Sequence, residues 1–409
     1  MKISTMRRID HLAGVPLCFV ATLLVRLICF FSGSQPTQPK KVLFVELSEM
    51  GSAILVDPAM RKIQRERDAE LHFVIFKSNI ASLRLLKTVP EDNIFAIRAE
   101  GFLTLALDSL RFLFWTRQRR IDTVIDLELF SRYSALLTGL TLAANRIGFH
   151  AFNDEGLYRG AMLTRRVAYN PHLHIAKNFI ALVNATLAAK EEVPFSKTPV
   201  DDDEIKLAQA EIDPNAIEAM RARILQEYPA YGEHRHRIVL INPNASDLLP
   251  QRRWMPEHFV TVMKGLLTDD PNLLILITGA PAEREGAAGL RQKVGDMRCI
   301  NFAGCHRLED IPALYRIAEL MLTNDSGPGH FSAVTQLHTF VLFGPETPKL
   351  YGSLGNSTPI YAGLACSPCV SATNHRKTPC TDNVCLQVIQ PATVLAQLRQ
   401  ALTKQPPAA

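Results

Sequence analysis

The stretch "TNDSGPGH", residues 323–330, has the residue types of a phosphate-binding turn. It follows an apolar run and leads into a helical stretch, and Asp325 or Ser326 can cap the start of that helix. Gly327 and Gly329 let a ligand approach the backbone, and the free N–H groups at a helix start attract anions. The pattern therefore indicates a diphosphate site, although an ordinary capped strand-to-helix turn would contain the same residues.

Residues suited to phosphate and ribose recognition occur elsewhere in the same half of the chain. Arg252 and Arg253 follow "INPNAS", and arginine forks match phosphate oxygens, so these side chains can neutralise a departing diphosphate. The alternative is a pair of surface arginines. Glu283, in "TGAPAERE", can accept hydrogen bonds from a ribose diol or stabilise the first turn of its own helix.

A second glycine-containing turn, "ELSEMGS" at residues 46–52, lies near the start of the chain. Ser52 follows the glycine and is expected to cap a helix, because an unassisted serine is a poor proton acceptor at neutral pH. Two carboxylates are close in sequence. Glu49 lies on the turn itself, whereas Asp57 lies about one and a half helical turns further on and is expected to point away.

Four cysteines near the C-terminus have the pattern C-x₂-C-x₁₀-C-x₄-C. They are Cys366, Cys369, Cys380 and Cys385, with His375 as a candidate fifth ligand. A structural Zn²⁺ can use these spacings, and reduced thiols or disulfides are the alternatives.

Apolar runs alternate with helical stretches from residue 41 onwards. The runs are continuous rather than alternating, which is typical of parallel strands covered by helices on both faces. The expected fold is therefore α/β, with two Rossmann-like, doubly wound domains facing a cleft at the carboxyl ends of their strands. The predicted strands lie at 41–47, 72–76, 93–97 and 123–128, and at 237–243, 272–279, 299–304, 320–325 and 339–344. The predicted helices of the first half lie at 53–66, 103–118 and 131–144.

The N-terminus is different in character. Residues 12–31 are mostly apolar, and about 17–25 such residues can span a bilayer. Pro16 and Arg26 weaken a spanning helix, and a cleaved signal peptide is a rival interpretation. We expect a hydrophobic anchor helix that spans the membrane or lies in its interface. The predicted division of the chain is a membrane anchor at 1–34, a tether at 35–40, a first domain at 41–195, a linker at 196–235, a second domain at 236–390, and a closing helix and tail at 391–409.

Composition supports this division. The chain has 409 residues, too many for one ordinary core, and 47% of them are hydrophobic while 21% are charged, which excludes a disordered protein. A formal net charge of +5 permits acidic partners such as phosphorylated lipids and does not demand nucleic acid. The stretch "RFLFWTRQRR" combines Phe112, Phe114 and Trp115 with several arginines. They can rest on an anionic membrane or meet acceptor phosphates, or the aromatic rings can face the core of the domain.

Several motifs in fixed order resemble glycosyltransferase family 9, the ADP-heptose:lipopolysaccharide heptosyltransferase family. In the second half these are "INPNAS…QRRWMPEHF", "TGAPAERE", "FAGCHRLEDIPALYRIAELMLTNDSGPGHFSAV", "FVLFGPETPKLYG" and "CSPC". In the first half they are "KVLFVELSEMGSAILVDPAM", "VIDLELFSRYSALLTGL…NRIGF" and "HIAKNFIAL". The resemblance covers residues 40–390 and rests on several ordered motifs rather than one.

The resemblance implies a GT-B fold and an inverting, metal-independent transfer of heptose or a related sugar. The donor would be an ADP-sugar held by the second domain, and the acceptor a lipid-linked lipopolysaccharide core held by the first. Carried over by motif, the donor-binding residues are Ser246, Arg252, Glu283, Asp325, Ser326, Gly327 and His330, and the acceptor-side residues are Gly51, Arg132 and His174.

One position departs from the family pattern. The family's catalytic base is an aspartate directly after the loop glycine, and this chain has Ser52 there. The catalytic positions are therefore Glu49, whose longer side chain can reach the site, and Ser52 beside it. The alternative function is a non-catalytic nucleotide-sugar-binding protein, and an epimerase with the same fold is a third hypothesis. Because the donor is made in the cytosol, we expect a monomer at the inner membrane with its catalytic domains on the cytoplasmic face and no nucleic-acid partner.

Overall fold

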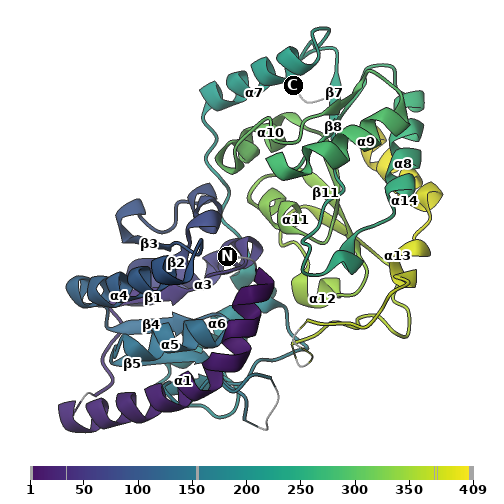
Figure 1. Ribbon diagram of the computed structural model, residues 1–409. Helices are drawn as coiled ribbons and strands as arrows, with labels where there is room; N and C mark the ends of the chain where they lie inside the picture. Colours follow the sequence, from purple (N-terminus) through teal and green to yellow (C-terminus); the bar gives the residue numbers. More distant parts are fainter. Residues whose placement is uncertain (1–2, 34, 153–155, 373, 375, 405–409) are drawn as a thin grey trace. The chain divides into compact units, whose positions relative to one another are not determined.

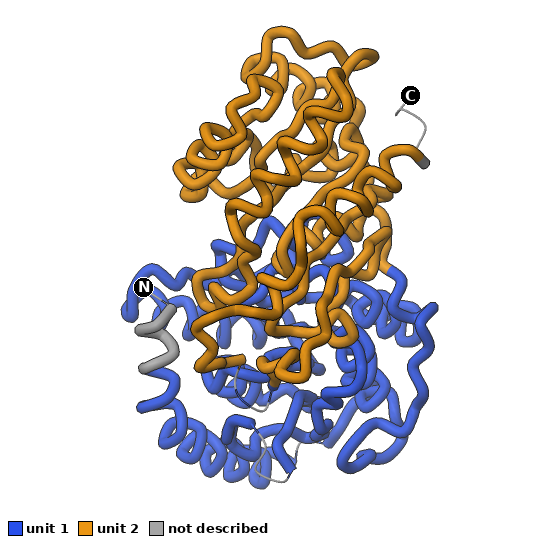
Figure 2. The backbone as a smooth tube through the Cα atoms, turned by 90° about the vertical axis from the view of Figure 1, so that its right-hand side faces the viewer, with its two compact units in different colours: residues 1–206, 372–375 blue, residues 207–371, 376–409 orange. Residues whose placement is uncertain are grey.

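The computed structural model describes residues 3–33, 35–152, 156–372, 374 and 376–404 (Figure 1). The chain divides into two compact units (Figure 2). Unit 1 consists of Met1–Lys206 and Ala372–His375, and unit 2 consists of Leu207–Ser371 and Arg376–Ala409. Each unit is built around a parallel sheet, which confirms the predicted α/β architecture with two Rossmann-like units.

The sheet of unit 1 has the strand order β3-β2-β1-β4-β5-β6, all parallel. Four of its six strands fall where the sequence predicts them. β5 and β6 escaped prediction because their residues, "NRIGF" and "RRV", are polar in part and lack the apolar run of a buried parallel strand. The strands are β1 (Lys41–Val45), β2 (Glu70–Phe76), β3 (Ile94–Ile97), β4 (Thr123–Asp126), β5 (Asn145–Phe149) and β6 (Arg165–Val167).

The sheet of unit 2 repeats this design, with the order β12-β11-β10-β7-β8-β9. β10 lies between β11 and β7, so the carboxyl ends of these three strands meet at one edge of the sheet. The last strand, β12, escaped prediction because its "STPIY" is only partly apolar. The strands are β7 (Arg237–Asn242), β8 (Leu273–Ile277), β9 (Cys299–Asn301), β10 (Leu320–Asn324), β11 (His338–Phe343) and β12 (Ser357–Tyr361).

Helices cover both faces of each sheet. In unit 1 the predicted helix at 53–66 is two helices, because Pro58 lacks an N–H and a new helix starts around it. The helices of unit 1 are α1 (Ile3–Ser32), α2 (Met50–Leu55), α3 (Asp57–Arg67), α4 (Phe102–Arg119), α5 (Arg132–Leu140) and α6 (Ile175–Leu187). Those of unit 2 are α7 (Pro214–Glu227), α8 (Pro256–Asp269), α9 (Arg284–Val294), α10 (Ile311–Ile317), α11 (Gly327–Phe331), α12 (Pro348–Tyr351), α13 (Val384–Gln387) and α14 (Pro391–Lys404).

The N-terminal helix α1 is docked on unit 1, where it runs alongside α5 (Figure 1). Cys18, Ala21 and Val25 recur at helical spacing and are buried against Ala135 of α5 and Met162. By length and composition alone, Ile9–Ser32 is the one segment among the described residues that could cross a membrane. The docking, which the sequence did not predict, makes α1 part of the fold of unit 1.

Gly160 allows this close approach. Its φ is +76°, and a Cβ there would lie 2.6 Å from Thr22 Oγ1 and 3.0 Å from the Cys18 carbonyl oxygen. We therefore expect Gly160→Ala to lower the free energy of unfolding by about 2–4 kcal/mol through backbone strain and overpacking. Urea unfolding, with amide hydrogen exchange in α1 as the local readout, measures this.

The matched control is Gly286→Ala in α9, where a Cβ would meet open space. That change should stabilise the chain by roughly 0.5–1 kcal/mol, because alanine favours helix more than glycine does. Equal effects of the two substitutions would contradict the tight docking of α1.

Candidate active site

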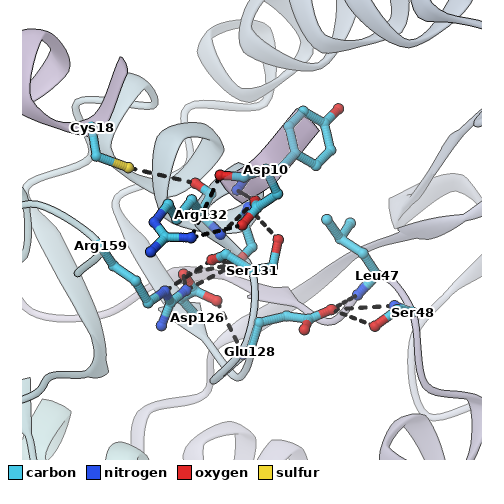
Figure 3. Close-up of polar contacts among 11 residues, drawn as sticks. Asp10, Cys18, Leu47, Ser48, Asp126, Glu128, Ser131, Arg132 and Arg159 are labelled. Atoms are coloured by element: carbon cyan, nitrogen blue, oxygen red, sulfur yellow. Dashed lines mark hydrogen bonds and ion pairs between the residues drawn. The ribbon is translucent and has the colours of Figure 1, made fainter. Parts of the chain in front are cut away.

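The loop after β1 is anchored by a buried carboxylate from the neighbouring strand β4. Glu128 Oε1 accepts hydrogen bonds from the backbone N–H groups of Leu47 at 3.0 Å and Ser48 at 3.2 Å, and from the Ser48 hydroxyl at 3.1 Å (Figure 3). β1 and β4 are paired in parallel, so the residues that follow them emerge at the same edge of the sheet. Glu128 thereby fixes the course of the loop that carries the candidate base.

A second buried carboxyl group, Glu46, completes this anchor. It is hydrogen-bonded to Glu128, and its Oε1 accepts the backbone N–H of Glu49 at 3.3 Å. Burial, followed by the negative charge of Glu128, raises the pKa of Glu46 well above its ordinary value. The hydrogen bond between the two groups raises the pKa of Glu46 and lowers that of Glu128, so Glu46 is the donor in this bond, although burial raises the pKa of Glu128 as well. Sequence reasoning missed both residues, although each is an acidic residue at the carboxyl end of a predicted strand.

The loop brings Glu49 and Ser52 together, the two positions predicted to be catalytic. The Ser52 hydroxyl donates a hydrogen bond to Glu49 Oε2 at 3.2 Å, and both side chains are half-buried. The prediction that Ser52 caps the helix is wrong, because α2 begins at Met50 and Glu49 occupies the cap position. The helix therefore begins almost one turn earlier than predicted. Gly51 lies inside α2, one residue before Ser52.

Asp57, the other carboxylate near this loop, is buried and hydrogen-bonded to Arg61 and Thr88. Its side chain is completely buried, Oδ2 accepts from Arg61 Nε at 2.8 Å, and Oδ1 accepts from the Thr88 hydroxyl at 2.5 Å. This agrees with the expectation that Asp57 points away from the loop, and it leaves Glu49 as the carboxylate that the loop presents.

Two arginines lie beside the end of β4, and both serve the internal structure. Arg159 forms a buried ion pair with Asp126 and donates from Nε to the Ser131 carbonyl at 2.9 Å (Figure 3). Arg132, predicted on the acceptor side, is buried with Nη1 3.3 Å from Asp10 Oδ2 of α1. The guanidinium of Arg132 therefore holds α1 in place.

His174, the third residue predicted on the acceptor side, caps α6. Its Nδ1 accepts the backbone N–H of Ala176 at 3.2 Å. This hydrogen bond requires the proton of a neutral imidazole to be on Nε2.

In unit 2 the ends of β7 and β10 are joined by Asn324. Its Nδ2 donates to the Pro243 carbonyl at 2.7 Å, and its Oδ1 accepts the backbone N–H of the buried Trp254 at 3.1 Å. The loop of residues 243–255, which carries the predicted phosphate ligands, is therefore held against the turn that begins at Asp325.

Arg252 lies among carboxylates at this edge. Its Nε is 3.3 Å from Asp325 Oδ2, and its Nη2 forms an ion pair with Glu346, which follows β11. Arg376 contacts the same carboxylate, with Nε 2.8 Å from Glu346 Oε1. The sequence motif "FGPETPKLYG" contains Glu346, but no pattern marked it as the partner of Arg252. Asp325 thus contacts the arginine and does not cap α11.

The two buried carboxyl groups differ in their protonation. Burial raises the pKa of Asp325 to about 7, and Arg252 opposes this rise. The pKa of Glu346 is lowered, although burial acts against the shift, because Arg376 and Arg252 both stabilise its charge. The cluster therefore has one permanent carboxylate between two arginines and one carboxyl group that titrates near neutral pH.

The remaining donor-side residues surround this cluster on the same edge. Glu283 is half-buried and its Oε2 accepts the Ala280 N–H at 2.6 Å, while a Cβ on Gly279 would touch both Glu283 Oε2 and Asn244 Nδ2 at 2.8 Å. Burial raises the pKa of Glu283. Ser246 is exposed on the neighbouring loop.

The predicted phosphate turn is present, with a shorter helix than expected. α11 has five residues, and Ser326 occupies its cap position without a side-chain capping hydrogen bond. A Cβ on Gly329 would lie 3.3 Å from Val341 Cγ2, so this glycine lets α11 pack on β11. His330 lies on α11 and is half-buried, and Gly327 is the first residue of the helix. Such a short helix contributes little macrodipole, which leaves Arg252 and the N–H groups as the means of holding an anion.

The four C-terminal cysteines are free thiols in the structure. Burial, followed by the other three thiols, raises the pKa of Cys385 to about 11, so the four lie near one another. In the part of the chain that the structure describes, no three His, Cys, Asp or Glu side chains are arranged to hold a metal ion. His375 lies outside the described residues. The structural zinc and its alternatives, reduced thiols or disulfides, therefore stay predictions.

A sequence model of "Glycosyltransferase family 9 (heptosyltransferase)" matches residues 113–378, more than half of the chain. Two curated relatives, lipooligosaccharide heptosyltransferase 2 of Campylobacter jejuni serotypes O:2 and O:6, are 29% and 28% identical over 171 and 172 residues. Each of these two alignments covers 41% of this chain, and they cover 51% and 52% of the relatives. The match therefore spans about half the length of the curated relatives.

Solved structures resemble the chain over nearly their whole length. The ADP-heptose LPS heptosyltransferase II of E. coli has a TM-score of 0.67 at 18% identity, covering 89% of this chain and 99% of that one. A family 9 glycosyl transferase from Veillonella parvula has a TM-score of 0.65 at 16% identity, covering 91% and 99%. E. coli heptosyltransferase WaaC with ADP has a TM-score of 0.58 at 18% identity, covering 88% and 99%. These similarities confirm the predicted GT-B fold.

The raised pKa of Asp325 makes stability depend on pH. Because the folded chain binds this proton more tightly than the unfolded chain, the resulting stabilisation is complete below about pH 4 and is lost as the pH rises through about 7. The side chain of Asp325→Asn has no such proton to lose. The free energy of unfolding of this variant should therefore increase, relative to that of the unsubstituted protein, as the pH rises over this range. Urea unfolding at four pH values measures the difference. The exposed Asp247→Asn, measured alongside, corrects for loss of a carboxylate, and a pH-independent difference for Asp325→Asn would contradict the assignment.

Proposed function

The chain belongs to glycosyltransferase family 9, and on this premise we propose that it transfers heptose or a related sugar from a nucleotide diphosphate donor to a lipopolysaccharide core acceptor. The observation that carries the proposal is the cluster at one edge of the unit 2 sheet. There Arg252 and Asp325 are in contact and Glu283 follows a neighbouring strand, in the order of the family's donor motifs. The relatives' names and the solved structures with ADP support a heptose donor activated by ADP.

The donor site would work through charge. We assign the donor diphosphate to the N–H groups of Ser326 and Gly327, the Ser246 hydroxyl, Arg252 and His330, and the ribose to Glu283. Arginine and backbone N–H groups stabilise the charge that develops on the leaving diphosphate, so the proposed transfer requires no metal. Turnover is therefore expected to survive treatment with EDTA.

The acceptor side would use Glu49 as the general base. Its carboxylate removes the proton of the attacking hydroxyl as that oxygen bonds to the anomeric carbon and the nucleotide diphosphate leaves from the opposite face, which inverts the configuration. The Ser52 hydroxyl, 3.2 Å from Glu49 Oε2, orients the carboxylate as a positioning residue. Gly51, Arg132 and His174 remain assigned to the acceptor side by resemblance, with Arg132 acting through its hold on α1.

The cellular setting follows from the substrates. A lipid-linked acceptor and the apolar α1 support attachment to the inner membrane, with both units on the cytoplasmic face where the donor is made. We propose that the chain acts there as a monomer. The alternative, a nucleotide-sugar-binding protein without turnover, is favoured by one observation, the absence of the usual aspartate at Ser52.

Glu49→Gln keeps the shape of the side chain and removes the base. We expect it to lower the turnover of ADP-heptose with a lipopolysaccharide core acceptor by about 10²–10⁴-fold, while the affinity for ADP, measured calorimetrically, stays unchanged. Glu66→Gln on α3, an exposed carboxylate of the same unit, is the matched control and should retain full activity.

Two outcomes would separate the hypotheses. Unchanged turnover in Glu49→Gln would remove Glu49 as the base. ADP-sugar binding without turnover, by the unsubstituted protein and with every core acceptor tried, would instead favour the binding protein.

A further inference from the structure

Helix α1 has two apolar faces, one buried within unit 1 and one exposed to solvent. Every third or fourth residue on one face, from Gly14 through Cys18, Ala21 and Val25, is buried within unit 1. The opposite face is solvent-exposed and equally apolar. Its large side chains are Leu12, Leu17, Phe19, Val20, Leu23, Leu24, Leu27, Ile28, Phe30 and Phe31, each about half exposed or more.

The buried face is held by specific contacts along its length. Asp10 pairs with Arg132 and accepts the backbone N–H of Arg132 at 2.9 Å and that of Tyr133 at 3.1 Å (Figure 3). The Thr22 hydroxyl accepts the N–H of Ala161 at 3.0 Å. Beyond the helix, Asn145 Nδ2 donates to the Thr37 carbonyl at 2.8 Å, so the segment that follows α1 is also bound to unit 1.

These contacts determine what α1 can do in a bilayer. A helix that spans a bilayer is surrounded by lipid or by other spanning segments. α1 would have to leave α5 to span, which would expose the buried Arg132 and break its ion pair with Asp10. Undocking would also break the hydrogen bonds that Asp10 accepts from the backbone N–H groups of Arg132 and Tyr133. The docked position therefore favours a helix that lies along the membrane surface.

A second apolar face lies on α4. Leu103, Leu107, Leu110 and Phe114 recur at helical spacing and are each more than half exposed, whereas Phe112 on the opposite side is buried in the core of the unit. Of the sequence alternatives for this helix, packing in the core is confirmed for Phe112 and Trp115, whereas Phe114 is exposed.

The two faces point to the same side of the sheet. α4 and α5 precede and follow β4, and right-handed crossovers place both helices on one face of the sheet. On α5, Leu137 packs into the sheet core and Ala135 packs against α1, so α1 covers the side of α5 that faces away from the sheet.

Charge identifies the occupant of these faces. Residues 1–40 contain the basic residues Lys2, Arg7, Arg8, Arg26 and Lys40 and one acidic residue, Asp10. Residues 102–120 contain Arg111, Arg117, Arg119 and Arg120 and one acidic residue, Asp108. Both acidic residues are paired, Asp10 with Arg132, and Asp108 with Arg98 at 2.8 Å and with Arg111 at 3.3 Å. A second copy of such a surface would be repelled, whereas an anionic bilayer would be attracted.

We propose that the exposed faces of α1 and α4 together form a monotopic membrane-docking surface. α1 lies in the plane of the interface, unit 1 stays on one side of the bilayer, and the partner is a surface rich in anionic phospholipid. This deepens the membrane attachment proposed above and does not depend on catalysis, so a chain without turnover would still bind.

Binding to vesicles tests the surface. The full chain should bind phosphatidylcholine vesicles containing about one third phosphatidylglycerol, and bind less as salt screens the arginines. The double substitution Leu110→Glu/Phe114→Glu changes two exposed side chains and should weaken partitioning about tenfold or more. Leu225→Glu on α7 of unit 2, also an exposed leucine, is the matched control and should bind within twofold of the unsubstituted chain. Equal binding by the double variant and the control, or a dimer in lipid-free solution that the double variant disrupts, would overturn the proposal.

Topology tests the orientation of α1. Epitope tags are placed at the two ends of the full chain and probed with protease. Both tags should be protected in intact spheroplasts, and both should be cut in inverted membrane vesicles. Tags on opposite sides of the membrane would show a spanning helix and overturn the in-plane assignment, whatever the activity of the protein.

Discussion

The geometry of the candidate catalytic loop depends on one buried carboxylate, Glu128, that ties the end of β4 to the loop after β1. It accepts two backbone N–H groups and a hydroxyl from Leu47 and Ser48, donors that a tight turn would otherwise leave without partners. The Leu47 N–H is buried, so removal of the carboxylate would leave this donor without a partner. Burial raises the pKa of both Glu128 and its neighbour Glu46, and this favours the shared hydrogen bond that lets two acidic groups lie together. With the loop fixed in this way, Glu49 is presented at its tip and Ser52 reaches back to it.

In unit 2 the group that is held in place by buried polar contacts is an arginine rather than a loop backbone. Arg252 must stay at the strand edge in the absence of an anion, and two carboxyl groups hold it there. Arg376 compensates Glu346, and Asp325 can take up a proton near neutral pH, so the cluster balances its charge as its surroundings change. Both units thus place chemistry at the carboxyl ends of parallel strands, where loops are free to vary while the sheet stays constant.

The sequence was informative where a pattern was local. Continuous apolar runs located nine of the twelve strands, and family motifs led to Arg252, Glu283 and Asp325. Short strands of mixed polarity, such as β6, were missed because their burial comes from neighbours rather than from their own residues. The partners Glu128 and Glu346 were missed because each acts on residues that are distant in sequence, and one sequence contains no signal for such a pairing.

The docking of α1 illustrates the same limit. Hydropathy shows that the helix is apolar, but not that one side of it packs against α5. Gly160 allows the close approach that this packing needs.

The most direct test of the central claim is a rescue measurement. If Glu49 has taken over the role of the aspartate that family members carry at the position of Ser52, then Glu49→Gln/Ser52→Asp should regain turnover that Glu49→Gln lacks. The measurement is the rate of sugar transfer from ADP-heptose to a lipopolysaccharide core acceptor, followed by the mass of the acceptor. Recovery of at least tenfold over Glu49→Gln is the predicted result. Full activity in Glu49→Gln without the second change, or no transfer by any variant including the unsubstituted protein, would contradict the account.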